Sequence, residues 1–225
     1  CEQIKVNLGY MKNKICMVGL ASGLVLGNLG FTHCCIEDIG ALRSIPNISI
    51  VVPADPFELF KVLNEAINYK DSVYIRLTAG SNTKIINNKD YKFEIGKAVE
   101  ILPGEDVVIV GCGNILGNCM EAVSILRKKN IQCSVVNMHT VKPIDDKKIK
   151  NLAKENKLIV TVEEHNIIGG LGTSVAEVLA SERSNCKLVR VGINDFYSSG
   201  GSYEYLKDIY GLSTEKIIKT VLSNL

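Results

Sequence analysis

Apolar and polar residues follow two alternating patterns along the chain, and together they predict an α/β fold. Short apolar runs such as "NKICMVGL", "ISIVV" and "DVVIVG" are typical of strands buried on both faces of a sheet. Between them lie segments such as "NILGNCMEAVSILRKKN", in which apolar residues recur every three or four positions, as on one side of a helix. Strands that alternate with helices predict a parallel sheet covered by helices on both faces.

One helix start is specified in detail by the segment "PADPFELFKVLNEAI". Asp55 suits the N-cap position, Pro56 the first helical position and Glu58 the third. We therefore expect a helix that begins at Pro56.

The pattern breaks once, and the break divides the chain into two units. From Ala79 to Tyr91 the segment "AGSNTKIINNKDY" is polar and has no period. We expect an incomplete first domain over 1–78 with three strands, a linker over 79–95, and a complete second domain over 96–225. The incomplete sheet should leave apolar side chains exposed near "CMVGL".

Composition narrows the class of protein. The chain has 225 residues, 46% of them hydrophobic, which is enough for a substantial core. Its 26 basic and 24 acidic residues give a formal net charge of +2, which argues against a nucleic-acid partner. No apolar run is long enough to cross a membrane. The eight cysteines form no C-x-x-C pair, which is typical of a reducing compartment and predicts a cytoplasmic protein.

Two residues are candidates for function because of their position. His33 follows the strand-like run "CMVGL" in a loop that contains glycines, and Arg76 ends the run "VYIR". In open α/β sheets, ligands bind at the carboxyl ends of the strands. An imidazole there can bind a hydroxyl or relay a proton, and a guanidinium matches a phosphate or carboxylate. The alternatives are a histidine that caps the next helix and an arginine in a surface salt bridge.

The segment "VEEHNIIGGLG" also contains candidate functional residues. Glu163, Glu164 and His165 could bind a metal or move protons, but no second His or Cys lies at metal-ligand spacing. The glycines that follow could present N–H groups to a phosphate, or could serve only a tight turn. These glycines are Gly169, Gly170 and Gly172.

A second glycine-rich segment, "VGCGNILGN", follows a strand pattern and opens a helix pattern. Its spacing is G-x-G-x-x-x-G, and the next strand ends in Asn137 rather than in an acidic residue. Both features differ from the dinucleotide-binding fingerprint, so we expect no nucleotide site here.

Three segments of the chain resemble the transketolase family. The first is "GFTHCCIEDIGALRSIPNISIVVPADP"; the others are "VVNMHTVKPID" and "VEEHNIIGGLGTSVAEVLA". They occur in the family's order and cover essentially the whole chain, and they fit the class whose transketolase is split into two subunits. The resemblance implies the end of a pyrimidine-binding domain followed by a complete three-layer α/β transketolase C-terminal domain.

The chemistry implied by the resemblance is transfer of a two-carbon ketol unit between sugar phosphates. His33 matches the family's histidine that contacts and polarises the sugar, and Arg76 matches the arginine that binds the substrate phosphate. Ala21 and Leu29 stand where full-length members have a histidine and an aspartate that contact the substrate, and Phe31 replaces a proline. These departures imply altered sugar recognition.

The resemblance also implies a cofactor and a partner. The family's catalytic glutamate lies further upstream than Glu2, and its diphosphate- and metal-binding motif belongs to the N-terminal subunit. We therefore expect thiamine diphosphate and Mg²⁺ to be bound mainly by residues outside this chain. The expected partner is an N-terminal transketolase subunit or domain, in a homodimer or heterotetramer, and the chain alone should be inactive.

Three other functions remain open at this point. The chain could be the beta subunit of a 2-oxo-acid dehydrogenase, a relative of deoxyxylulose-phosphate synthase, or a non-catalytic module for subunit association. The segments "MHTVKPID" and "EEHNIIGGLG" favour transketolase over these.

Overall fold

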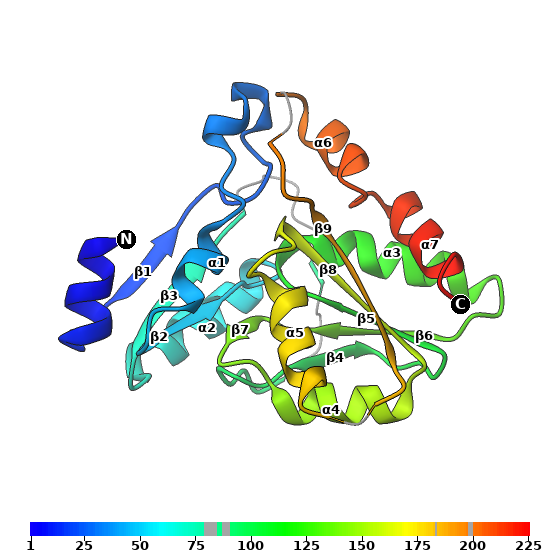
Figure 1. Ribbon diagram of the computed structural model, residues 1–225, viewed down its shortest axis with the longest axis horizontal. Coiled ribbons are helices and arrows are strands. Elements are labelled where there is room, and N and C mark those ends of the chain that lie inside the picture. The colour runs from blue at the N-terminus through cyan, green and yellow to red at the C-terminus, as the bar shows by residue number, and fades with distance from the viewer. Residues whose placement is uncertain (79–84, 87–90, 183, 198–199) are drawn as a thin grey trace.

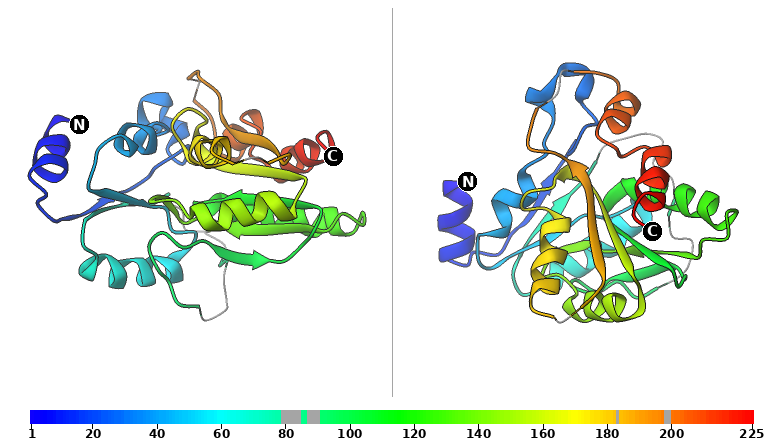
Figure 2. Two further views of the ribbon diagram at one scale, coloured as in Figure 1. Left: turned by 60° about the horizontal axis from the view of Figure 1, so that its bottom comes forward. Right: turned by 45° about the vertical axis from the view of Figure 1, so that its right-hand side comes forward.

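The computed structural model describes residues 1–78, 85–86, 91–182, 184–197 and 200–225. Over these ranges the chain forms two β-sheets, each packed against helices (Figure 1). The amino-terminal and carboxy-terminal helices lie at opposite ends of the molecule (Figures 1 and 2). The predicted α/β fold class is confirmed.

The first sheet has the strand order β1-β3-β2-β7. Its first three strands are parallel, as expected, whereas β7 pairs antiparallel with β2. This fourth strand comes from the second unit, and the sequence does not reveal it because three residues are too few to show a period. The strands are β1 (Cys16–Gly19), β2 (Ile48–Val51), β3 (Ser72–Arg76) and β7 (Thr140–Lys142).

The first unit also contains helices, and one of them, α2, begins at Pro56 as predicted. The Asp55 carboxylate accepts a hydrogen bond from the Glu58 backbone N–H at 2.8 Å, and the Glu58 carboxylate accepts one from Ala54 N–H at 2.6 Å. The elements are η1 (Ile4–Tyr10), η2 (Gly27–Leu29), η3 (Phe31–His33), α1 (Asp38–Arg43) and α2 (Pro56–Asn68).

The second sheet has the order β4-β6-β5-β8-β9, and it is parallel except for β4. Its strands are β4 (Val99–Leu102), β5 (Val107–Gly111), β6 (Cys133–Asn137), β8 (Leu158–Asn166) and β9 (Lys187–Ile193). The helices of this unit are η4 (Gly113–Ile115), α3 (Leu116–Arg127), α4 (Asp146–Glu155), α5 (Leu171–Ala180), α6 (Tyr203–Ile209) and α7 (Thr214–Leu222).

Helices cover both faces of the second sheet and make the expected three layers. Val107 and Ile109 of β5 pack in one apolar cluster with α3 and α7, whereas Val108 and Val110 pack in another with α4 and α5. This alternation is what a fully buried strand requires, because successive side chains point to opposite faces. Figure 1 shows α3 beside α7 on one side of this sheet and α4 with α5 on the other.

The connection between the units is packed against the first unit where the structure describes it. Phe93 and Ile95 are buried in a cluster with Val62 and Ala66 of α2. Residues 79–84 and 87–90 of the expected linker lie outside the described residues. The first strand of the second unit, β4, begins at Val99, and the domain boundaries stay a prediction.

The expected exposed apolar surface near "CMVGL" is confirmed. Strand β1 lies at the edge of the first sheet, where Val18 is 47% and Leu20 73% exposed. An edge strand with exposed apolar side chains favours association with another chain or segment. Among the helices that the structure describes, none is both long and apolar enough to pass through a bilayer.

Candidate functional site

His33 lies in an exposed loop between β1 and α1. It ends the short 3-10 helix η3, and its side chain is exposed. Its Nδ1 lies 3.2 Å from the hydroxyl of the adjacent Thr32. The N-cap of α1 is Glu37, and no side chain caps that helix. The helix-cap interpretation of His33 is therefore wrong, and its imidazole is accessible to a ligand.

Arg76 ends β3 at the carboxyl edge of the first sheet, as expected, but it is only 2% exposed. Its Nε donates to the Asp38 carboxylate at 2.8 Å, and its Nη2 donates to the carbonyls of Cys35 and Glu164 at 3.0 and 3.1 Å. The surface-salt-bridge interpretation is therefore wrong. The described contacts tie the guanidinium to two separate parts of the chain, the segment that holds Cys35 and Asp38 and the end of β8 at Glu164.

Asp38 is the anionic partner of this buried arginine. Besides Arg76, its carboxylate accepts a hydrogen bond from the Tyr74 hydroxyl at 2.8 Å. Burial acts to raise the pKa of Asp38, but the charge and hydrogen bonds of Arg76 outweigh burial and hold that pKa below its usual value. Asp38 is thus a carboxylate at neutral pH, and the pair satisfies the charge that burial would otherwise penalise.

Glu164 connects the second unit to the loop that carries His33. Its Oε1 accepts a hydrogen bond from Leu24 N–H at 2.6 Å, and its Oε2 accepts one from the Tyr203 hydroxyl at 2.6 Å. Burial raises the pKa of this carboxyl, and the two hydrogen bonds oppose the shift. Gly23 also packs here, because a Cβ at that position would lie 2.2 Å from Glu164 Oε1.

The Glu163 carboxylate binds at the start of α5, where the glycines in the sequence suggested a possible phosphate site. Its carboxylate accepts from the N–H groups of Leu171 and Gly172 at 2.6 and 2.8 Å, at the first turn of α5. Burial raises the pKa of Glu163 to about 7, and the two N–H groups oppose the shift. Gly170 is required because a Cβ there would lie 1.9 Å from Glu163 Oε2. The phosphate-site interpretation is therefore wrong: the protein's own carboxylate accepts from this turn, whereas Gly169 packs closely against Gly40.

The metal-site interpretation of Glu163, Glu164 and His165 finds no support either. Over the described part of the chain, no cluster of three or more His, Cys, Asp or Glu side chains could hold a metal ion. Each carboxylate instead bonds to donors within the chain.

His165 is the third member of this segment, and it joins the two units as a neutral imidazole. Its Nδ1 donates to the Asn166 carbonyl at 2.7 Å, and its Nε2 accepts from Gly40 N–H of α1 at 3.3 Å. Burial, followed by the positive charge of Arg76, lowers the pKa of His165 to about 4. A proton on Nε2 would break the bond to Gly40 and place a second cation near Arg76.

This arrangement predicts that neutral His165 contributes to the stability of the fold and that this contribution is lost on mild acidification. The folded-state pKa of His165 is lowered to about 4, so the unfolded chain takes up a proton first as pH falls below about 6.5. The stability that neutral His165 contributes is present at pH 7 and is lost toward pH 4. Between pH 7 and pH 5 this loss lowers the free energy of unfolding by about 2 kcal/mol.

Urea unfolding at pH 7 and pH 5 measures this loss. His165→Gln should lose about 2 kcal/mol less than the wild type. His139 offers a matched variant, because burial also lowers its pKa to about 4. His139→Gln should reduce the loss by a similar amount, and the double variant should combine both effects. An unchanged loss in His165→Gln would contradict a neutral buried imidazole.

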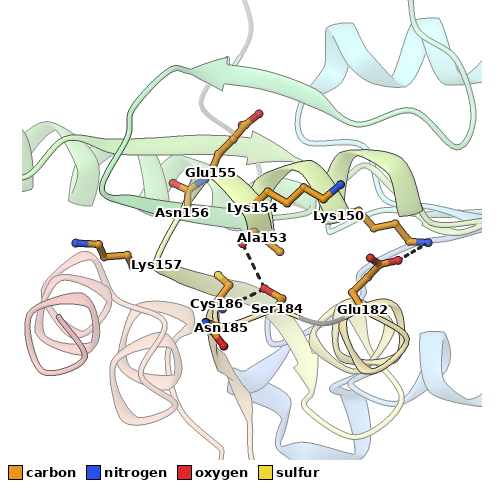
Figure 3. A pocket seen from close by; sticks show the side chains of 10 residues that line it. All are labelled: Lys150, Ala153, Lys154, Glu155, Asn156, Lys157, Glu182, Ser184, Asn185 and Cys186. Carbon is orange, nitrogen blue, oxygen red and sulfur yellow. Dashed lines mark hydrogen bonds and ion pairs between the residues drawn. The ribbon is translucent and has the colours of Figure 1, made fainter.

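A hollow in the second unit lies at the end of its sheet where β8 and β9 begin. Residues at the end of α4 and just before β9 surround a cavity of about 470 Å³ (Figure 3). An ion pair between Lys150 and Glu182, 2.9 Å apart, stands at its side (Figure 3). This edge holds the amino ends of β8 and β9, away from His33 and Arg76, so the cavity is not part of their site.

The comparisons with known proteins agree with this fold. Residues 2–83 match the model of the transketolase pyrimidine-binding domain, and residues 96–217 match that of the transketolase C-terminal domain. The chain belongs to the transketolase family. Both matches follow the order in which the two transketolase domains were expected.

Individual transketolase relatives match nearly the whole chain. One subunit of the apulose-4-phosphate transketolase of Phocaeicola vulgatus is 35% identical over 98% of this chain and 70% of its own length. A solved split-gene transketolase, an inactive β4 tetramer, has a TM-score of 0.87 at 32% identity, over 99% of this chain and 70% of its own. The 1-deoxy-D-xylulose-5-phosphate synthase of Dictyoglomus turgidum is 35% identical over 99% of this chain and 36% of its own length.

Sequence reasoning missed two parts of this transketolase site. Asp38 lies inside the quoted family motif, but nothing in its local pattern marks it as the partner of Arg76, 38 residues away. Tyr203 gives no signal at all, because its contact with Glu164 spans 39 residues and its helix, α6, was not expected. Both depend on how the two units pack together.

Proposed function

We propose that the chain is the C-terminal part of a thiamine-diphosphate-dependent enzyme that transfers a two-carbon ketol unit between sugar phosphates. The observation that carries the proposal is the exposed imidazole of His33, in a loop after the carboxyl end of β1 that Glu164 ties to the second unit. Family membership supplies the reaction class. The similarity to subunits of split transketolases supports a role within a larger assembly.

In this proposal His33 contacts the sugar substrate. An imidazole can accept or donate a hydrogen bond to a hydroxyl or carbonyl near neutral pH. The ring is exposed and, among the described residues, contacts the hydroxyl of Thr32, so it is available for that task. Phosphate binding by Arg76 stays a prediction from the resemblance. The described contacts of Arg76 favour a different role, in which its guanidinium holds the surrounding residues in position.

The described residues do not offer a site that fits thiamine diphosphate and Mg²⁺. The glycine-rich start of α5, where a diphosphate could have bound, is filled by the Glu163 carboxylate. No metal-binding cluster is present among the residues described. We therefore assign the cofactor to an N-terminal transketolase subunit or domain, which would join this chain in a homodimer or heterotetramer, and we expect this chain alone to be inactive.

The substrate is proposed to differ from the usual pentose phosphates. Ala21 and Leu29 replace the histidine and aspartate of the family pattern, and Leu29 is 60% exposed in the loop before His33. An apolar side chain cannot hydrogen-bond a sugar hydroxyl, so this part of the site should favour a substrate with fewer hydroxyls to satisfy.

We also propose a cytoplasmic location, since all eight cysteines are free thiols.

A reconstitution assay tests the proposed function. The chain is combined with its N-terminal partner subunit, thiamine diphosphate and Mg²⁺, and transfer of a ketol unit from a ketose phosphate to an aldose phosphate is followed. Transfer by the mixture and not by either component alone is the expected result. Condensation of pyruvate with an aldose phosphate, without ketol transfer, would instead support the deoxyxylulose-phosphate synthase alternative.

A further inference from the structure

An aromatic pair joins the His33 loop to the second unit. The rings of Phe31 and Tyr197 are stacked, with centroids 5.0 Å apart and planes inclined by 29°. Phe31 begins the turn η3 that His33 ends, whereas Tyr197 follows β9 in the second unit. Such pairs stabilise an arrangement beyond the apolar area they bury. The pair thus bridges the two units two residues from the candidate substrate-binding histidine.

The same two segments also meet through their backbones. Gly201 N–H donates to the Gly27 carbonyl at 3.0 Å, and a Cβ at Gly200 would lie 3.1 Å from Gly30 Cα. In Figures 1 and 2 the turns before α1 lie beside the start of α6 at one end of the molecule. The second unit therefore supports the His33 loop from one side over several residues.

The turn follows a glycine with a left-handed backbone. Gly30, just before it, has φ +91°, a conformation that glycine adopts at little steric cost. Among the described residues, the hydrogen-bond contact of the His33 side chain is with the neighbouring Thr32. Phe31 stacks on the second unit through its ring, and Cys34, just after the turn, packs against the same apolar cluster.

We propose that Tyr197 is a positioning residue that holds the η3 turn, and with it the imidazole of His33, in the orientation that receives the substrate. The proposal rests on the proposed function for the role of His33. Stacking needs the ring of Tyr197 and not its hydroxyl. Tyr197→Phe should therefore keep the pair, whereas Tyr197→Ala should release the turn.

Amide hydrogen exchange tests the pair without requiring any activity. The N–H of His33 donates to the Gly30 carbonyl and that of Cys34 to the Phe31 carbonyl, so both report on the turn. In the full chain, Tyr197→Ala should speed their exchange by about three- to tenfold, as expected for loss of one aromatic pair. Tyr197→Phe should exchange like the wild type. Tyr10→Ala removes an exposed tyrosine of η1, which is not part of this loop. It is the control and should also exchange like the wild type.

Kinetics of the reconstituted enzyme then test positioning. Tyr197→Ala should lower kcat/KM for the phosphorylated sugar by about three- to tenfold, with unchanged affinity for thiamine diphosphate, and Tyr197→Phe should restore it. Unchanged amide exchange in Tyr197→Ala would show that the aromatic pair does not hold the turn. Faster exchange with unchanged kcat/KM would show that the pair holds the turn but does not position His33 for the substrate. Absence of ketol transfer in the wild type would refute the proposed function and with it the role of Tyr197 toward substrate, while the exchange data would still decide whether the pair holds the turn.

Discussion

Asp38→Asn is expected to lower the free energy of unfolding by about 3–5 kcal/mol. The substitution keeps the shape of the side chain but removes its charge, which leaves the guanidinium of Arg76 buried without the carboxylate that it hydrogen-bonds. Arg76 is 2% exposed, so water cannot replace the lost carboxylate. Two further acceptors of Arg76 in the described chain are backbone carbonyls, which do not neutralise the charge.

Chemical denaturation of Asp38→Asn against the wild type at pH 7 measures this loss. The matched control is Glu177→Gln, which breaks the ion pair between Arg43 and Glu177 at the same interface. Because the Glu177 side chain is 60% exposed, this change should cost less than about 1 kcal/mol. Equal losses in the two variants would show that Arg76 does not depend on Asp38 for its charge balance.

His33→Ala is expected to lower kcat/KM of the reconstituted enzyme by about ten- to a hundredfold. The loss corresponds to one hydrogen bond that the imidazole makes to the sugar. The stability of the chain should hardly change, since the His33 side chain is exposed and bonds only to Thr32 within the described chain. Affinity for thiamine diphosphate should also stay the same, because the histidine is assigned to the sugar.

Steady-state kinetics, cofactor titration and thermal unfolding of the same preparation separate these effects. Asn28→Ala is a suitable control, because Asn28 is an exposed polar residue in the same loop and has no assigned role. It should change kcat/KM by less than about threefold. Loss of cofactor binding or of the fold in His33→Ala would assign the histidine a structural role instead.

Local patterns predicted the elements of this fold well because each carries its own signal. The buried strands are continuous apolar runs in the sequence, and Asp55, Pro56 and Glu58 form the helix start that their types favour. The strand β7 was not predicted because its three residues have no periodicity and pair only with β2. The signal in that case lies in tertiary packing and not in the segment.

The candidate site was harder to predict because its contacts join distant segments. The position of Arg76 at a strand end was correct, but its burial depends on Asp38, Cys35 and Glu164, which lie 38 to 88 residues away in the sequence. The glycines after His165 suggested an anion site, and an anion does bind there: the carboxylate of Glu163. The local pattern thus indicated the chemistry of that helix start but not its occupant.

The packing between the two units explains how the second unit can influence the loop that carries His33 in the first. Glu164 bonds to Leu24 N–H, and Tyr203 bonds to the same carboxylate. His165 accepts from the N–H of Gly40, in the helix that follows the loop. A second unit that only promoted association would not need buried carboxylates at these positions, where burial is costly unless the groups are bonded.

We propose that this chain supplies the substrate side of a transketolase and does not itself hold the cofactor. Calorimetric titration with thiamine diphosphate and Mg²⁺ tests it most directly, with the isolated chain and the chain mixed with its N-terminal partner measured side by side. The account predicts no micromolar binding by the isolated chain and clear binding by the mixture. Micromolar binding by the isolated chain, or ketol transfer without the partner, would contradict it.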